Sequence, residues 1–206
     1  MSTNAHIPPA EQVRAHDLPP ILLLDVDGVI NAFHGSWGAP ITRTRCAGQP
    51  IRYAPALFDR LRVLHQSGTV VIRWSSTWCG IPDQLAALTA LLGVDVEPAF
   101  GPHRPLSKTW GDLKVEAALS ALGEGRRVIW ADDEEAAAGR RLFPAIAEAE
   151  REGWLLLVMP RSEFGLQPED VEAINAFCRA DYVAVPASLS RAGADRSPHP
   201  PRQSVA

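Results

Sequence analysis

Residues 21–28 read ILLLDVDG: an apolar run, two aspartates separated by one valine, and a glycine. An unbroken apolar run of this kind is typical of a β-strand that is covered on both faces, as in a parallel sheet with helices on either side. We therefore predict a central, buried strand that ends in two acidic residues, Asp25 and Asp27. Gly28 allows the tight backbone turn that follows.

Short apolar runs alternate with amphipathic stretches along the chain to about residue 180. This alternation predicts an α/β domain with a mostly parallel sheet between layers of helices. Right-handed crossovers then bring the carboxyl ends of the strands to one edge of the sheet, where open α/β folds build their sites. Strands are expected at 21–27, 69–74, 94–100, 126–130 and 154–160, and helices at 55–68, 81–93, 110–125, 142–153 and 166–180.

The length of the chain favours one domain. Its 206 residues, 46% of them hydrophobic, can bury one good core and would be crowded as two domains. Residues 1–19 and 184–206 are rich in proline and polar residues and have no sustained hydrophobic period. We therefore expect a flexible leader, one domain over residues 20–183 and a disordered tail.

Charge and hydropathy restrict the possible partners. The net charge of −4 argues against a general nucleic-acid binder, because such proteins usually carry a basic surplus. No apolar run approaches the roughly 20 residues that span a bilayer, and the N-terminus lacks the basic-then-apolar order of a signal peptide. A cytoplasmic protein without a membrane partner is expected. Cys46, Cys79 and Cys178 lack the paired spacing of a zinc site, so we expect reduced, unligated thiols.

Asp25 and Asp27 lie two residues apart where a strand ends, so both carboxylates can turn toward one site above the sheet. One carboxylate can attack phosphorus and form an aspartyl-phosphate, which divides a difficult hydrolysis into two easier steps. The other can protonate the leaving oxygen and then activate water. Gly28 permits close approach of a ligand. Without further motifs, the same residues could form only an acidic turn.

A second acidic pair, Asp132 and Asp133, follows the predicted strand at 126–130. The apolar body of that strand cannot compensate two adjacent charges. Mg2+ takes oxygen ligands in octahedral geometry, and carboxylates from two strand ends together with a phosphate oxygen would suit it. The alternative is a solvated helix cap, because acidic side chains favour a helix N-terminus.

Hydroxyl and ammonium groups complete the predicted site. Ser75, Ser76 and Thr77 follow a third strand, where one hydroxyl could hydrogen-bond a transferring phosphoryl group. Serines in such a turn are also common helix caps. Lys114, early in the predicted helix at 110–125, could neutralise both a phosphate and the attacking carboxylate, and Lys108 competes with it for this role.

The chain order of these motifs resembles the four motifs of the haloacid-dehalogenase-like superfamily over about residues 21–180. That order is DxDG, a strand-end hydroxyl, a lysine and an acidic pair. The stretches LLLDVDGVIN, WSSTW and VIWADDE resemble more closely the small bacterial branch that includes the phosphatase-like domain of Swiss Army knife RNA repair proteins. One departure is serine in place of the more usual threonine at the first hydroxyl position of the WSSTW-like motif, which leaves Ser75 as a candidate beside Ser76.

The resemblance implies a three-layer, Rossmann-like sandwich with Asp25 as nucleophile and Asp27 as general acid and base. Ser76 would be the hydroxyl that binds phosphate, with Gly28 and Ser75 beside the substrate, and Lys114 would be the phosphate-stabilising lysine. The implied ligands of Mg2+ are Asp25, the backbone carbonyl of Asp27, Asp132 and Asp133.

Between the first strand and the first helix, ITRTR and PIRY, joined by residues 46–49, read as a β-hairpin. By resemblance this hairpin is the flap of the superfamily, without a large cap domain. An open site suits an exposed phosphate on a larger molecule, such as a nucleic-acid end, or needs a partner subunit for closure. The period of two places Arg43 and Arg45 on one face, near Arg52, where they could bind further phosphates. The alternative is a solvated hairpin whose charged edge discourages aggregation.

Two other classes of protein share parts of this pattern. A receiver domain also gathers acids, a hydroxyl and a lysine around Mg2+, but it places its acidic pair first and its lysine last. A phosphate-binding module that has lost turnover is the second alternative. The order of motifs favours a Mg2+-dependent phosphatase that forms an aspartyl-phosphate on the way to hydrolysing a phosphomonoester, such as a small molecule, a nucleotide or a nucleic-acid end.

Overall fold

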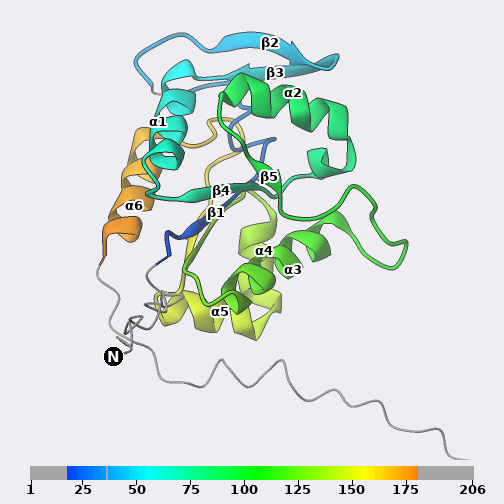
Figure 1. Ribbon diagram of the computed structural model, residues 1–206, viewed down its shortest axis with the longest axis vertical. Helices are drawn as coiled ribbons and strands as arrows, with labels where there is room; N and C mark the ends of the chain where they lie inside the picture. Colours follow the sequence, from blue (N-terminus) through cyan, green and yellow to red (C-terminus); the bar gives the residue numbers. More distant parts are fainter. Residues whose placement is uncertain (1–17, 36, 181–206) are drawn as a thin grey trace, which may run out of the picture.

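The computed structural model describes residues 18–35 and 37–180 (Figure 1). Apart from Leu18 and Pro19, the predicted leader lies outside the described residues, and so does the whole of the predicted tail. The described part forms an α/β domain, as the alternation of apolar and amphipathic stretches predicts. None of its helices combines the length and the apolar composition that a membrane crossing requires.

The centre of the domain is a parallel sheet with the strand order β5-β4-β1-β6-β7. The predicted parallel sheet is therefore confirmed. Its middle strand is β1 (Ile21–Leu24), all four residues of which are buried. The other strands are β4 (Val71–Trp74), β5 (Glu97–Pro98), β6 (Val128–Ala131) and β7 (Leu155–Val158).

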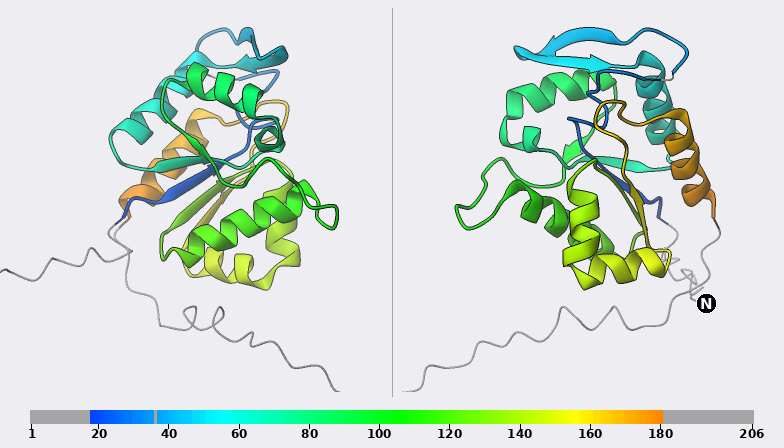
Figure 2. Two further views of the ribbon diagram at one scale, coloured as in Figure 1. Left: turned by 45° about the vertical axis from the view of Figure 1, so that its right-hand side comes forward. Right: turned by 180° about the vertical axis from the view of Figure 1, so that it is seen from behind.

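Helices cover both faces of the sheet and give three layers (Figure 1, Figure 2). Leu22 and Leu24 of β1 belong to one hydrophobic cluster, and Ile21 and Leu23 to the other, because side chains alternate across a strand. The first face carries α1 (Pro55–Gln66), α2 (Pro82–Leu92) and α6 (Pro168–Arg179), and the second carries α3 (Trp110–Gly123), α4 (Glu135–Leu142) and α5 (Pro144–Arg151).

The first strand, expected over 21–27, ends at Leu24, and two other elements differ more from the sequence prediction. The strand expected at 94–100 is only Glu97–Pro98, since Pro98 has no N–H to continue the ladder. The helix expected at 142–153 is preceded by a separate helix, α4, which the sequence pattern did not predict. Gly139 in α4 leaves room for the ring of Trp130, because an added Cβ would lie 2.8 Å from that ring. Pro144 then starts α5 and prevents one continuous helix.

The predicted hairpin is present between β1 and α1. It consists of β2 (Thr42–Cys46) and β3 (Gln49–Tyr53), and its turn contains Ala47 and Gly48, both at positive φ. Cys46 and Ile51 are buried in the core, which fixes the hairpin on the helices of the first face. It is the only two-stranded sheet that the structure describes, and no cap domain lies between β1 and α1 within residues 25–35 and 37–54.

The loops that follow β1 and β7 are joined at the carboxyl edge of the sheet. The amides of Phe33 and His34 donate to the Glu163 carbonyl at 3.1 and 2.9 Å, and the Leu166 amide donates to the Val29 carbonyl at 2.8 Å. Gly165 lies inside this junction with φ +64°, and an added Cβ would overlap the Val29 carbonyl oxygen. The two loops are therefore held as one unit.

This packing predicts the effect of adding one methyl group at Gly165. Gly153 has a similar φ of +78° but has no atom within 4 Å of an added Cβ, so it is a matched control. Gly153→Ala should lower the free energy of unfolding by about 1 kcal/mol, from backbone strain alone. Gly165→Ala should cost about 2 kcal/mol more, because the Val29 carbonyl must also move. Urea unfolding measures both values, and equal losses would contradict the predicted overlap.

Candidate functional site

The register of the sheet brings three predicted site residues to the same level. Leu24 pairs with Trp74 on one side and with Ala131 on the other, so the next residues are Asp25, Ser75 and Asp132. The Ser75 amide donates to the Leu24 carbonyl at 2.9 Å, and the Asp25 amide donates to the Ala131 carbonyl at 3.0 Å. These bonds continue the sheet up to the point where the acidic residues begin.

Lys114 of α3 connects the carboxylates. Its ammonium lies 2.7 Å from Asp25, 2.9 Å from Asp132 and 2.9 Å from Glu135, and only 2% of its side chain is exposed. Lys108, the competing candidate, is partly exposed and pairs with Glu116 at 2.6 Å. Lys114, and not Lys108, is therefore the lysine at the carboxylate cluster. Glu135 is an additional partner that sequence reasoning missed, although it lies in the acidic run that begins at Asp132.

Asp133 joins Asp25 and Asp132 to form the candidate metal centre. One carboxylate oxygen from each of these residues lies within 4.8 Å of the others. Gly28 has φ +72°, and an added Cβ would overlap the Asp133 carboxylate. The glycine of the DxDG motif is thus needed both for the turn and for the approach of Asp133. The carboxylate of Asp27 is not part of this group.

The cluster carries more negative than positive charge. The pKa of Asp25 is raised to about 7, because burial and the nearby Asp132 together outweigh the opposing effect of Lys114. Burial also raises the pKa values of Asp133 and Glu135. Burial would lower the pKa of Lys114, but Asp25 and Asp132 outweigh that effect and raise it. Three carboxylates contact the one ammonium and Asp133 adds a fourth to the cluster, so the oxygen ligands of Asp25, Asp132 and Asp133 fit a hard cation such as Mg2+.

Asp27 lies at the exposed rim of the cluster. One of its oxygens accepts a hydrogen bond from the Asn31 amide group at 2.6 Å, and the other accepts from the indole N–H of Trp78 at 2.9 Å. These two donors hold the carboxylate in place while leaving it in contact with solvent. Sequence reasoning missed both, although Trp78 closes the WSSTW stretch and Asn31 ends LLLDVDGVIN.

Ser75 and Ser76 are both buried beside Asp25. A hydrogen bond from the Ser76 hydroxyl acts to lower the pKa of Asp25, although burial outweighs it. The Ser76 hydroxyl also accepts the Trp78 amide at 3.4 Å, which starts the short 3-10 helix η2 (Thr77–Gly80). The Ser75 hydroxyl has no hydrogen-bond partner within residues 18–35 and 37–180. Ser76 is therefore the hydroxyl that contacts Asp25.

Arg43 and Arg45 are exposed on the hairpin, and the structure does not bring them to the carboxylates. Arg45 donates to the Gly48 carbonyl in its own turn. Arg43 lies opposite Arg52 in the antiparallel register, so these two side chains share a face. Within the described part of the chain, neither Arg43 nor Arg45 forms an ion pair with the cluster.

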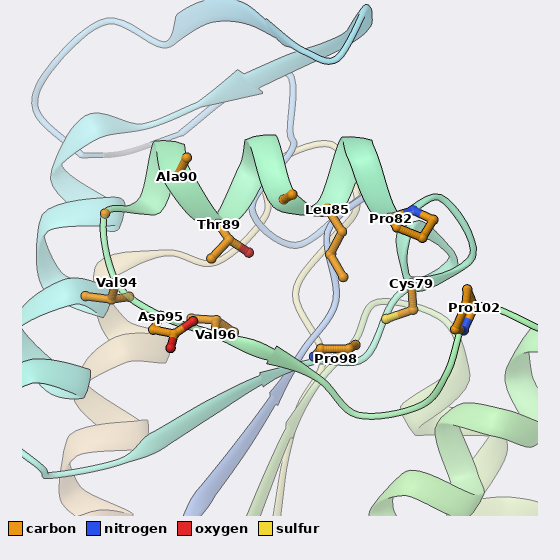
Figure 3. Close-up of a pocket in the computed structure, with 12 residues that line it drawn as sticks. Cys79, Pro82, Leu85, Thr89, Ala90, Val94, Asp95, Val96, Pro98 and Pro102 are labelled. Carbon is orange, nitrogen blue, oxygen red and sulfur yellow. The ribbon is translucent and has the colours of Figure 1, made fainter.

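A separate apolar cavity of about 710 Å³ lies between α2 and the segment that contains β5. Leu85 and Thr89 point from α2 toward Val96 and Pro98 (Figure 3). None of the clustered carboxylates lines this cavity. The charged cluster, and not the larger cavity, therefore carries the candidate chemistry.

Comparison of the chain with protein-family models, with curated proteins and with solved structures found no match. The function is therefore inferred from the geometry of the cluster and from the motifs in the sequence.

The raised pKa of Asp25 predicts that the ionised carboxylate destabilises the metal-free protein. Because the folded value of about 7 exceeds the ordinary 3.8, the contribution of Asp25 to stability is greatest below pH 3.8 and is lost as the pH rises through 7. At pH 8 in chelator, Asp25→Asn should therefore stabilise the fold by about 1–3 kcal/mol, a rise in Tm of roughly 2–10 °C. Lys114 keeps Asp132 and Glu135 as partners in this variant.

Thermal unfolding from pH 4 to pH 8 tests this expectation. The difference between Asp25→Asn and wild type should become small at pH 4, where Asp25 is protonated in the folded state and the pH is close to its ordinary pKa of 3.8 in the unfolded state. A lower Tm for Asp25→Asn at pH 8 would mean that the ion pair with Lys114 outweighs burial.

Proposed function

We propose that this chain is a Mg2+-dependent phosphatase of the haloacid-dehalogenase type, which hydrolyses a phosphomonoester through an aspartyl-phosphate on Asp25. The observation that carries the proposal is the ammonium of Lys114 between Asp25 and Asp132, which form a three-carboxylate group with Asp133. The exposed Asp27 follows Asp25 by two residues. The proposed nucleophile Asp25, the proposed acid Asp27, the Lys114 ammonium and the candidate cation site then all belong to the carboxyl edge of the sheet. The order of the motifs in the sequence supports the same conclusion.

In the first step, a carboxylate oxygen of Asp25 forms a bond to phosphorus as the bond from phosphorus to the leaving alcohol breaks. Asp27 in its protonated form gives its proton to the departing oxygen, which leaves as the neutral alcohol. In the second step, the Asp27 carboxylate takes a proton from water, and the water oxygen attacks phosphorus. The bond to Asp25 then breaks, which releases inorganic phosphate and restores both side chains.

Lys114 and the hydroxyl groups have supporting roles in this proposal. Lys114 favours the reactive ionised form of Asp25 against the effect of burial, and it opposes repulsion between the carboxylate and an approaching phosphate. The Ser76 hydroxyl, which contacts Asp25, is the proposed donor to a phosphate oxygen, and the buried Ser75 hydroxyl has no partner within the described residues and is the second candidate. Mg2+, held by Asp25, Asp132, Asp133 and the carbonyl of Asp27, would supply positive charge against the phosphate oxygens.

Removal of the nucleophile tests the proposal directly. With Mg2+ and p-nitrophenyl phosphate, Asp25→Asn should lower kcat by about a thousandfold or more, since the covalent step is lost. Asp95→Asn, at an exposed aspartate before β5, is the matched control and should retain wild-type turnover. Chelator should abolish the wild-type activity. Binding of Mg2+ and phosphate by the wild type without any turnover would instead identify a binding module.

The hydrogen bonds from Asn31 and Trp78 hold Asp27 in place for its proposed role as an acid. We therefore predict that the loss of activity on changing Asp27 or Trp78 depends on the leaving group of the substrate. Asp27→Asn should reduce kcat/KM for an alkyl phosphate about a hundredfold more than for p-nitrophenyl phosphate, whose leaving group needs no proton. Trp78→Phe, which removes the 2.9 Å hydrogen bond to Asp27, should give the same pattern at about tenfold. Equal losses on the two substrates would contradict the acid role of Asp27.

A further inference from the structure

An exposed aromatic ring lies close in sequence to the catalytic turn. Phe33 is 62% exposed, whereas its neighbour Ala32 is buried. The guanidinium carbon of Arg52 lies 4.4 Å from the centroid of the Phe33 ring. A guanidinium over one face orients the ring through a cation–π contact. The large exposed fraction leaves the opposite face open.

A continuous set of hydrogen bonds links this ring to Asp27. The Asn31 side chain donates to Asp27 at 2.6 Å and accepts from the Arg52 amide at 2.8 Å. The Ala32 amide donates to the Arg52 carbonyl at 3.1 Å. The Phe33 amide is in turn fixed by the Glu163 carbonyl in the loop after β7. The backbone of Phe33 and that of Arg52 are therefore tied to the segment whose Asn31 side chain contacts Asp27.

The proposed mechanism determines what part of a substrate lies beside Asp27. Asp27 must reach the oxygen of the leaving group, so the leaving group extends from the phosphate toward Asp27 and its partner Asn31. The next side chains along the hydrogen-bonded set are Phe33 and Arg52. The body of the leaving alcohol then meets a ring with one free face.

We infer that Phe33, backed by Arg52, is a stacking subsite for a planar aromatic group on the leaving alcohol, as in a nucleoside monophosphate. This inference rests on the proposed phosphatase function. Every nucleobase has a π-face that can stack on an aromatic side chain, so the subsite selects an aromatic ring without reading its hydrogen-bonding edge. Arg52 should strengthen the preference for an aromatic group. Its guanidinium covers one face of the Phe33 ring, so a base on the opposite face would extend an existing stack.

Adenosine 5′-monophosphate and ribose 5-phosphate test the subsite, since they share the reacting ester and differ by the base. The wild type should show a kcat/KM at least tenfold higher for the nucleotide. Phe33→Ala should lower the ratio of the two kcat/KM values about tenfold, Phe33→Leu should do the same, and Phe33→Trp should preserve the ratio. Leu106→Ala is the control, because Leu106 is fully exposed on the loop before α3, and this change should leave both values unaltered.

Several outcomes would overturn the subsite while leaving the phosphatase proposal intact. They are equal hydrolysis of the two substrates by the wild type, an unchanged ratio in Phe33→Ala, or full retention of the ratio by Phe33→Leu. Binding of adenosine 5′-monophosphate to the Asp25→Asn protein is a second readout, independent of turnover. Phe33→Ala should weaken that binding about tenfold, and the absence of any such binding would also overturn the subsite. Failure of the phosphatase proposal would instead appear as no Asp25-dependent turnover of p-nitrophenyl phosphate.

Discussion

The buried ammonium of Lys114 is the interaction on which the carboxyl edge of the sheet depends. It contacts Asp25 after β1, Asp132 after β6 and Glu135 at the start of α4, and thereby joins three segments to α3. A buried carboxylate without a partner would cost several kcal/mol, so these segments can meet only because the lysine lies between them. The Thr109 and Asp112 capping box fixes the first turn of α3 and so places Lys114. The structural requirement and the proposed catalytic role therefore coincide in the side chain of Lys114.

The same arrangement leaves the cluster short of positive charge. Asp132 receives additional support, because its free oxygen accepts the Glu134 and Glu135 amides at 3.0 and 2.6 Å. Burial raises the pKa of Asp133 although its own backbone N–H opposes that rise, and Gly28 lets its carboxylate approach the other two. The negative charge of the Asp133 carboxylate beside Asp25 and Asp132 must therefore be compensated by a proton or by a bound cation. The fold thus accepts an electrostatic cost at one place, which is typical of a site that binds a ligand.

Local patterns predict the sheet and the order of the site residues, but not the contacts across it. The ILLL run correctly predicts a buried central strand, since helices cover β1 on both faces. Asp25 and Asp132 come to the same level because β1 and β6, which precede them, are paired in register. The choice between Lys108 and Lys114 depends on the orientation of α3, which no local pattern reports. The sequence pattern does not predict α4, because the acidic run at its start and Gly139 within it interrupt the apolar period of this short helix. Asn31 and Trp78 reach Asp27 through tertiary hydrogen bonds, so their residue types alone do not reveal that role.

The two aspartates of the DxDG motif have different environments, which suit the two different chemical roles that we propose for them. Asp25 is the last residue at the level of the sheet, is buried and contacts an ammonium, whereas Asp27 lies beyond the turn, is exposed and receives two neutral donors. A nucleophile benefits from a fixed, water-poor position, while an acid and base must exchange protons with a leaving group and with water. Two identical side chains acquire these different environments because Gly28 turns the chain immediately after Asp27. Under the proposed mechanism, this turn directs the leaving group toward the loop side of the cluster, where Asn31 and then Phe33 follow Asp27 along the chain.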